Sequence, residues 1–303
     1  MNANYPSIIV PLDGSATAEN AIPFAIAIAQ RAGSHIALVH VHDEGVLVAN
    51  APMMDSGWED KRAAEMGGAV RAMAERLARE TGLGVTAVTL RGPAAPSLVQ
   101  HAIDCAADLI VMTTHGRSGF SRAWFGSVTE RVIHAATTPV LVVHAGNHAR
   151  ADMTAPLFRH VLLPIDREQS GAEAMQRALS LGTDGRTTYT LLTVVSALPV
   201  LPSAYPTVGE IVEDPGFERR GADAAALLKR VAVPARTAGA ATDVRVVTHE
   251  RAASAILEVA ESKVDLIVLP THPRGSLSRA LLGSVVDKVM RGATVPLLLF
   301  RAS

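Results

Sequence analysis

Short apolar runs alternate with longer amphipathic segments along the whole chain. In the first half, the apolar runs have the length of strands and lie at 7–12, 35–42, 84–91, 109–113 and 140–143. The segments between them have the length and composition of helices and lie at 17–32, 59–81, 96–106 and 127–136. This order, βαβαβαβαβ, predicts an α/β fold with a parallel five-stranded sheet and helices on both of its faces.

The second half of the chain repeats the first. Asp108-Leu-Ile-Val returns as Asp265-Leu-Ile-Val and Gly126-Ser-Val as Gly283-Ser-Val, both at an offset of 157, whereas 7–13 matches 160–166 at an offset of 153. A repeat of this length predicts two copies of one domain. We expect the domains at 1–147 and 157–303, each with its own open, twisted sheet, and the boundary in the polar segment 144–156.

Composition narrows the class of protein. The formal net charge is −1, from 28 basic and 29 acidic residues, whereas nucleic-acid binding usually needs a basic surface. The chain shows neither a signal-peptide pattern nor an apolar stretch near the roughly 20 residues of a membrane helix. Its single cysteine, Cys105, excludes a disulfide within the chain. We therefore expect a cytoplasmic protein without nucleic-acid or membrane partners.

Two segments of the first half carry candidate chemistry. Pro11-Leu-Asp13 ends the first predicted strand, and Thr113-Thr-His-Gly116 ends the fourth. Ligands of open parallel sheets bind at the carboxyl ends of strands, where the strand order reverses. Gly116 and Gly126 would let the backbone approach a ligand closely.

The residues after Gly126 favour an anion. Ser127-Val-Thr-Glu130 has the pattern of a capping box and predicts a helix start. A helix start offers free N–H groups and a positive dipole end, which suit phosphate, and Arg117 and Arg122 could add charge. Spacing alone also allows a purely structural loop. Asp13 could likewise be a strand-end residue or the cap of the next helix.

Together these residues resemble the universal stress protein family. The resemblance rests on Asp13 after an apolar strand, on THGRSG, on the nine residues between Gly116 and Gly126, and on GSVTERV and TTPVLVV. It covers both halves and implies a tandem protein with the adenine nucleotide alpha hydrolase-like fold. Nucleotide-binding members carry G-x2-G-x9-G-S/T. Gly116, Gly126 and Ser127 match this pattern, whereas Thr113 replaces its first glycine.

The resemblance implies an adenine nucleotide, ATP or AMP, in the first domain. It places the adenine and ribose side near Asp13, Val41 and Met112. The remaining positions line the site or surround the phosphates: Pro11, Leu12, Thr113, His115, Gly116, Arg117, Gly126, Ser127, Val128 and Thr129. His115 could instead order the loop, because His272 keeps its position in the second copy. Mg²⁺ or Mn²⁺ would be held mainly by phosphate oxygens, without protein side chains as ligands.

The second copy departs further from the pattern. Asp166 and Val194 keep the adenine positions and Gly283-Ser284 the helix start, but Pro270 and Pro273 replace two glycines. A proline lacks an N–H group and has a fixed φ, so we expect this half to bind nucleotide poorly or not at all. The resemblance also implies that the last strands, 140–143 and 297–300, pair and form a pseudo-dimer within the chain; a homodimer is also open.

For two further features, a structural interpretation is favoured over a functional one. His40-x-His42 places two histidines on one face of a strand, which is a weak metal pattern, and a solvent-facing strand end is the favoured alternative. Cys105 lies in the apolar setting AIDCAADLIV, so we expect it to be buried and inert.

Three functions compete. The favoured one is a nucleotide-binding stress-response or signalling module rather than a metabolic enzyme. The others are a slow ATPase or phosphotransfer enzyme and a ligand-free interaction module. The chain has no Walker-type G-x4-G-K-S/T, and near the loop it has neither paired carboxylates nor an obvious general base.

Overall fold

The structure is a computed structural model of the chain. It describes residues 5–43, 56–114, 126–144, 147, 156–181, 186–196, 216–271 and 283–302. Within this part of the chain, no helix is both long enough and apolar enough to cross a membrane.

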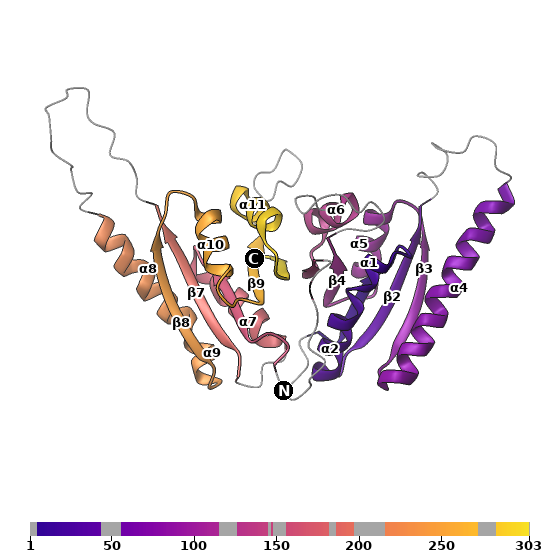
Figure 1. The fold of residues 1–303 in the computed structure, drawn as a ribbon, viewed down its shortest axis with the longest axis horizontal. Helices are drawn as coiled ribbons and strands as arrows, with labels where there is room; N and C mark the ends of the chain where they lie inside the picture. Colours follow the sequence, from indigo (N-terminus) through magenta and orange to yellow (C-terminus); the bar gives the residue numbers. More distant parts are fainter. Residues whose placement is uncertain are drawn as a thin grey trace, which may run out of the picture.

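Both halves have the predicted alternation of strands and helices (Figure 1). The first half contains β1 (Ser7–Pro11), α1 (Ala16–Glu19), α2 (Ile22–Ala32), β2 (His35–His42), α4 (Ser56–Thr81), β3 (Val85–Arg91), α5 (Ala94–Asp104), β4 (Leu109–Thr113), α6 (Ser127–Ala135) and β5 (Val140–Val143). The second half contains β6 (His160–Pro164), α7 (Glu168–Ser180), β7 (Thr188–Val195), α8 (Phe217–Val231), α9 (Val233–Thr237), β8 (Ala241–Thr248), α10 (Ala252–Ala260), β9 (Leu266–Thr271), α11 (Ser284–Gly292) and β10 (Leu297–Arg301).

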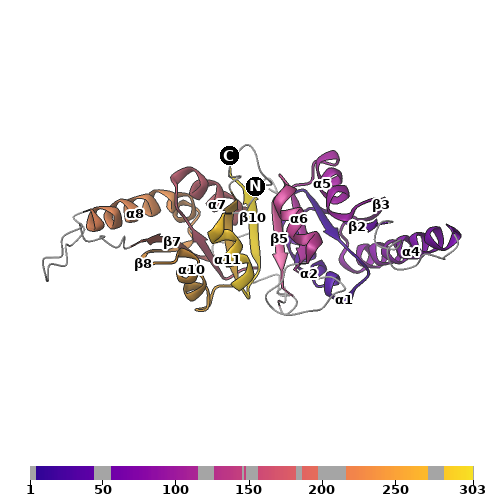
Figure 2. The same cartoon turned by 90° about the horizontal axis from the view of Figure 1, so that it is seen from above.

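The strands form one continuous sheet of ten, in the order β3-β2-β1-β4-β5-β10-β9-β6-β7-β8. Strands within each half are parallel, which confirms the α/β prediction. The two five-stranded sheets meet where β5 and β10 pair antiparallel, with Leu141 opposite Leu298 (Figure 2). The predicted pairing of the last strands is therefore confirmed.

Alternating side chains build two apolar layers, one on each face of the sheet. In β1, Ile8 and Val10 pack on the face of α2 and α4, whereas Ile9 packs on the face of α5 and α6. This follows from the two-residue period of a strand. Both layers continue into the second half, under α7 and α8 on one face and under α10 and α11 on the other. Inner strands such as β4 and β5 are buried along their whole length because both faces are covered, whereas the edge strands β3 and β8 include exposed polar residues.

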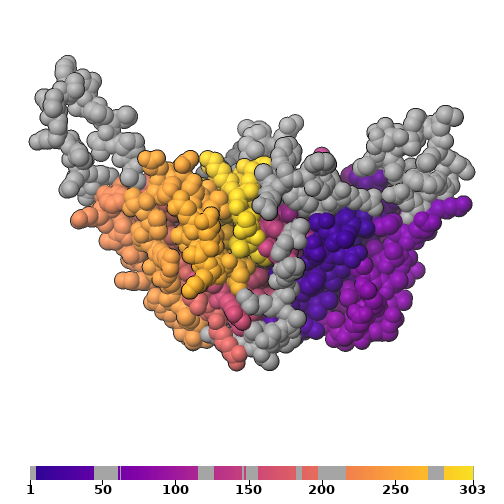
Figure 3. Space-filling model, in the orientation of Figure 1, coloured from indigo at the N-terminus to yellow at the C-terminus, as the bar shows by residue number. Residues whose placement is uncertain are grey.

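The two halves lie side by side (Figure 3), and side chains of the two halves also contact each other beside the sheet. The Tyr5 hydroxyl of the first half donates to the Arg177 carbonyl of the second at 3.4 Å. Within the second half, the guanidinium of Arg177 lies 5.0 Å from the ring centre of Phe300. Phe24 stacks on Phe158 with 6.3 Å between ring centres. At the offset of 153, Phe158 is the counterpart of Tyr5 and Arg177 that of Phe24. The contact is therefore isologous in form.

Two local predictions are wrong. The segment 17–32 forms two helices, because the chain leaves α1 at Asn20 and restarts with Pro23 in the first turn of α2, where a missing N–H costs nothing. Cys105 is exposed rather than buried. It follows the last turn of α5 on the solvent side, where Ile103 is also 53% exposed.

Candidate functional site

The candidate site of the first half lies where the strand order reverses. β1 pairs with β2 on one side and with β4 on the other. The helices that follow β1 and β4 therefore lie on opposite faces of the sheet. The ends of β1 and β4, the end of β2 and the start of α6 therefore meet at one edge.

The end of β1 is held from β2 by two hydrogen bonds. The Leu12 N–H donates to the Val39 carbonyl at 2.8 Å, and the Leu12 carbonyl lies 2.9 Å from Nδ1 of His40. Because a carbonyl can only accept, Nδ1 of His40 is the donor. His40 is 6% exposed, so this bond is shielded from water. These contacts fix the position from which Asp13 projects.

Asp13 is neither a bare strand end nor the helix cap. Its Oδ1 accepts from the Ser15 N–H at 2.9 Å and from the Ser15 hydroxyl at 2.6 Å. Ser15 is the N-cap of α1, because its hydroxyl oxygen accepts from the Ala18 N–H at 3.1 Å. Asp13 thus orients the cap and lies between the strand end and the helix.

The helix after the loop begins at Ser127, as predicted, but not through a capping box. Gly126 is the N-cap, because its carbonyl accepts from the Glu130 N–H at 3.0 Å. Ser127 is therefore the first helical residue, one position too late for its hydroxyl to cap the helix. The Gly126 N–H donates to the Thr114 carbonyl, which joins the helix start to the end of β4.

A second bond joins these elements. The Thr129 hydroxyl donates to the Thr113 carbonyl at 2.8 Å, and both residues are buried. The Thr129 hydroxyl proton is therefore used to hold α6 against the end of β4. The N–H groups of Ser127, Val128 and Thr129 have no acceptor within the helix, as in any first helical turn. They are the donors that α6 offers to a ligand.

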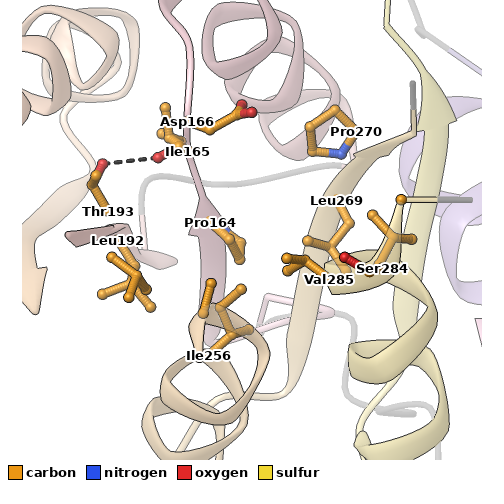
Figure 4. Close-up of a pocket in the computed structure, with 14 residues that line it drawn as sticks. Pro164, Ile165, Asp166, Leu192, Thr193, Ile256, Leu269, Pro270, Ser284 and Val285 are labelled. Carbon is orange, nitrogen blue, oxygen red and sulfur yellow. Dashed lines mark hydrogen bonds between the residues drawn. The ribbon is translucent and has the colours of Figure 1, made fainter. Parts of the chain in front are cut away.

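In the second half, the corresponding residues enclose a pocket of about 300 Å³ (Figure 4). Ten of its fourteen lining residues are the repeat counterparts of predicted first-half positions. These ten are Pro164, Ile165, Asp166, Val194, Leu269, Pro270, Gly283, Ser284, Val285 and Val286. All four residues predicted for the second half, namely Asp166, Val194, Gly283 and Ser284, are among them. The first-half counterparts of the ten lining residues are Pro11, Leu12, Asp13, Val41, Met112, Thr113, Gly126, Ser127, Val128 and Thr129.

Sequence reasoning missed the other four lining residues, which are Leu192, Thr193, Ala252 and Ile256. Thr193 replaces His40 of the first half, and its hydroxyl donates to the Ile165 carbonyl at 2.8 Å. Both copies therefore hold the end of their first strand in the same way. The repeat offset of 157 combined with the predicted helix 96–106 was the signal that could have found Ile256; Ala252 lies one residue before the segment that this maps to.

Comparison with known proteins supports one assignment over the full length. The model of the universal stress protein family matches residues 4–144 and again residues 157–301. The chain belongs to the universal stress protein family.

Relatives in this family include chains of the same length. A universal stress protein of Mycobacterium tuberculosis is 26% identical over 98% of this chain and 97% of its own. One from Methanocaldococcus jannaschii is 35% identical over 141 residues, which cover 46% of this chain and 82% of that protein. The crystal structure of a universal stress protein from Archaeoglobus fulgidus covers both chains completely with a TM-score of 0.72 at 18% identity, which supports the fold.

Part of the family pattern lies outside the described residues. This applies to His115, Gly116, Arg117 and Arg122 in the first half, and to His272 and Pro273 in the second. The prediction that His115, Gly116 and Arg117 contact a nucleotide stays a prediction.

The histidine pair on β2 faces the interior rather than solvent. His40 and His42 are each 6% exposed. By the two-residue period of a strand, they share the face of Ile36 and Leu38, which is the one that α2 and α4 cover. Within the described part of the chain, no group of three or more His, Cys, Asp or Glu side chains lies close enough together to hold a metal ion.

Proposed function

We propose that the first half of this universal stress protein binds an adenine nucleotide, ATP or AMP, and that the chain acts as a regulatory or signalling module. The base lies near Val41 and Met112, with Asp13 on its ribose side. The phosphates lie at the start of α6. Magnesium or manganese accompanies ATP through its phosphate oxygens.

The observation that supports this proposal most is the second-half pocket. Its walls consist mainly of counterparts of the residues assigned to the first half. Because the two halves are repeats with the same order of elements, we infer the same arrangement for the first-half set, which supports a ligand site there. The first half also keeps Gly116 and Gly126, which allow close approach to phosphates.

The backbone of β2 supports recognition of a flat ring. The Val39 carbonyl faces β1, because it accepts from the Leu12 N–H. Peptide groups two residues apart on a strand point the same way, so the C=O and N–H of Val41 face the same side, beyond the end of β1. A heteroaromatic ring with one donor and one acceptor on its edge pairs with this arrangement.

The proposal is tested by denaturing freshly purified protein and identifying released nucleotides by chromatography and mass spectrometry. We expect about one adenine nucleotide per chain. A Gly126→Val preparation serves as the matched control and should release none. A nucleotide-free preparation that also gives no calorimetric signal with ATP and Mg²⁺ would refute the proposal and favour a ligand-free interaction module.

The regulatory role is tested separately. With the site saturated by ATP and Mg²⁺, we expect turnover no faster than that of the Gly126→Val variant. Hydrolysis that exceeds this background and disappears with Gly126→Val would instead identify the chain as an ATPase.

A further inference from the structure

Strand β8 ends the ten-stranded sheet on the side of the second half (Figure 1). It pairs with β7 along all eight of its residues and with no other strand of the described part of the chain. Helices α8 and α9 pack against it from one face of the sheet, and a helix on that face does not pair with the backbone at the edge. Unpaired N–H and C=O groups along a sheet edge are a template for another strand.

The hydrogen bonds to β7 show which backbone groups of β8 face outward. The His249 N–H donates to the Val195 carbonyl at 3.2 Å, so the peptide groups of His249 face β7. Because these groups alternate in direction along a strand, the N–H and C=O of Thr242, Val244 and Val246 face the outer edge. Each of these residues offers one donor and one acceptor to a further strand.

Two opposite charges lie at the middle of this edge strand. Nε of Arg245 donates to Oδ2 of Asp243 at 2.6 Å, and the two side chains are 45% and 44% exposed. They are two residues apart and therefore on the same face of the sheet, opposite to the face on which Val244 and Val246 pack. Edge strands that avoid pairing often carry lysine, since like charges repel when two copies meet. A pair of opposite charges gives no such protection.

A twofold axis at Val244 makes β8 complementary to an antiparallel copy of itself. Asp243 then lies opposite Arg245 of the second copy, and Thr242 lies opposite Val246. Val244 pairs with its own copy through the outward N–H and C=O groups. The positions of Asp243 and Arg245 are then non-hydrogen-bonded pairs, in which the Cα atoms are about 4.5 Å apart and side chains are closest. An axis at Asp243 or at Arg245 would instead place like charges opposite each other, which disfavours those registers.

The other edge of the sheet lacks this property. Strand β3 has the sequence VTAVTLR, and Arg91 at its end is its only charged residue. No antiparallel register between two copies of β3 therefore brings opposite charges together. Self-complementarity is confined to β8, and it predicts a closed pair of chains with one twofold axis rather than a growing fibre.

An exposed apolar side chain lies beside the same edge. Val233 of α9 is 54% exposed and is one of two large hydrophobic side chains in the described part of the chain that are exposed to this degree. Arg236 follows three residues later, on the same side of the helix, and its Nε donates to Oγ1 of Thr242 at 2.8 Å. The side of α9 that carries Val233 is therefore turned towards the start of β8, where a second copy would cover apolar surface.

We propose that two copies of this chain associate through antiparallel pairing of their β8 strands around a twofold axis at Val244. In the pair, Asp243 of each chain contacts Arg245 of the other, and the two ten-stranded sheets become continuous. This contact differs from the β5–β10 pairing within one chain, and it does not depend on nucleotide binding. Pairing of one strand buries little surface, so the pair is reversible, as are interfaces at the low end of the size range.

The test is sedimentation velocity of the full chain between about 1 µM and about 1 mM, the range in which weak pairs dissociate. We expect a shift from monomer to dimer without larger species. Asp243→Arg and Arg245→Asp should each weaken the dimer by roughly tenfold or more, because like charges then face each other. An equimolar mixture of the two variants should dimerise again, since each supplies the charge that the other lacks. Both variants have lost the ion pair within the chain, so recovery in the mixture reports only the contact between chains.

A proline tests the backbone pairing. Val244→Pro removes an N–H that faces outward, so the ladder to β7 stays intact, and the dimer should be lost. Ala87→Pro is the matched control on β3. The Gly92 N–H donates to the His42 carbonyl at 3.0 Å, so the N–H of Ala87, an odd number of residues away, also faces outward. Ala87→Pro should leave the dimer unchanged. A chain that stays monomeric throughout, a dimer that survives Val244→Pro, or a mixture of charge variants that stays monomeric would each overturn the proposal.

Hydrogen exchange followed by NMR tests the wild-type chain without any substitution, and circular dichroism establishes that the variants fold. The amides of Thr242, Val244 and Val246 are open to water in the monomer and bonded in the dimer. We expect their exchange to slow several-fold from low to high protein concentration, whereas the amides of Asp243 and Arg245, which face β7, should not change. If centrifugation finds a dimer and these rates do not depend on concentration, the chains associate elsewhere and the proposal is wrong.

Discussion

The imidazole Nδ1 of His40 donates a hydrogen bond to the carbonyl oxygen of Leu12 at 2.9 Å, from the end of β2 to the end of β1. In the second half, Thr193 donates to Ile165 at 2.8 Å in the same place. Two unlike side chains thus serve one purpose, which is to hold the turn that carries Asp13 or Asp166. The fold needs a donor at this position, and either a histidine or a threonine can supply it.

Replacement of His40 should therefore affect both stability and the proposed nucleotide site. His40→Ala leaves the Leu12 carbonyl without this buried donor, which costs about 1–3 kcal/mol. It also loosens Asp13, so we expect ATP affinity to fall by roughly tenfold, or ~1.4 kcal/mol. Denaturant unfolding and calorimetry measure the two effects. Thr193→Val, the matched change in the second half, should lower stability without altering ATP affinity. Equal ATP affinities in both variants would show that His40 is purely structural.

Gly126 and Gly283 provide a second matched pair. Gly126 has φ −59° and ψ 142°, which valine adopts readily, so Gly126→Val should fold. Its side chain would cover the first N–H groups of α6 and reduce ATP binding by roughly 100-fold or more, about 2.7 kcal/mol. At Gly283, an added Cβ meets no atom of the described residues within 4 Å, and Gly283→Val should leave ATP binding intact. Calorimetry with ATP and Mg²⁺ compares them, and similar losses in both variants would remove the proposed asymmetry.

Thr113 occupies the place of the first glycine in the family pattern, so Thr113→Gly should leave ATP affinity equal or higher. Thr113 is 6% exposed, and its carbonyl holds the Thr129 hydroxyl. Glycine keeps this carbonyl but loses the buried side chain and stiffens the strand less, so we expect a stability loss of about 1–2 kcal/mol. Thr113→Ala controls for the lost side chain alone. Weaker ATP binding by Thr113→Gly than by Thr113→Ala would contradict the assignment of this position.

The sequence predicted those structural features that depend on residues close together in the chain. The strands His35–His42, Leu109–Thr113 and Val140–Val143 were predicted with their observed bounds, because strands buried on both faces are continuous apolar runs. The start of α6 was predicted correctly for the wrong reason. Ser127 and Glu130 fit a capping box, but Gly126 takes the cap position.

Long-range contacts were beyond the sequence. His40 and His42 are polar residues at a strand end, and packing on the α2 and α4 face of the sheet buries them. The bond from His40 to Leu12 spans 28 residues. Cys105 has apolar neighbours in sequence but is exposed to solvent. In these cases, tertiary packing decided the environment, and residue type alone did not reveal it.

Tyr5 makes the contact between the halves sensitive to alkali. Burial raises the pKa of Tyr5 to about 12, against an opposing effect of Arg177. Because the folded pKa lies above the unfolded value of about 10, the folded state retains the proton. Stability is therefore complete below pH 10 and falls as the pH rises from 10 towards 12, by up to ~3 kcal/mol. Unfolding by urea at several pH values should show this loss in wild type and a smaller one in Tyr5→Phe. Parallel curves for the two proteins would refute the assignment to Tyr5.

Cys105 should react readily in the native protein. It is the single cysteine of the chain and is exposed, with its Sγ 4.0 Å from the Ala102 carbonyl, too far for a strong hydrogen bond. We expect one thiol per chain to react with Ellman's reagent, at a rate within about tenfold of the denatured protein, since access governs thiol reactions. Cys105→Ser should abolish the signal and change the unfolding free energy by less than about 0.5 kcal/mol, as usual for surface positions. A native thiol that reacts only after denaturation would place Cys105 in the interior and contradict the structure at the end of α5.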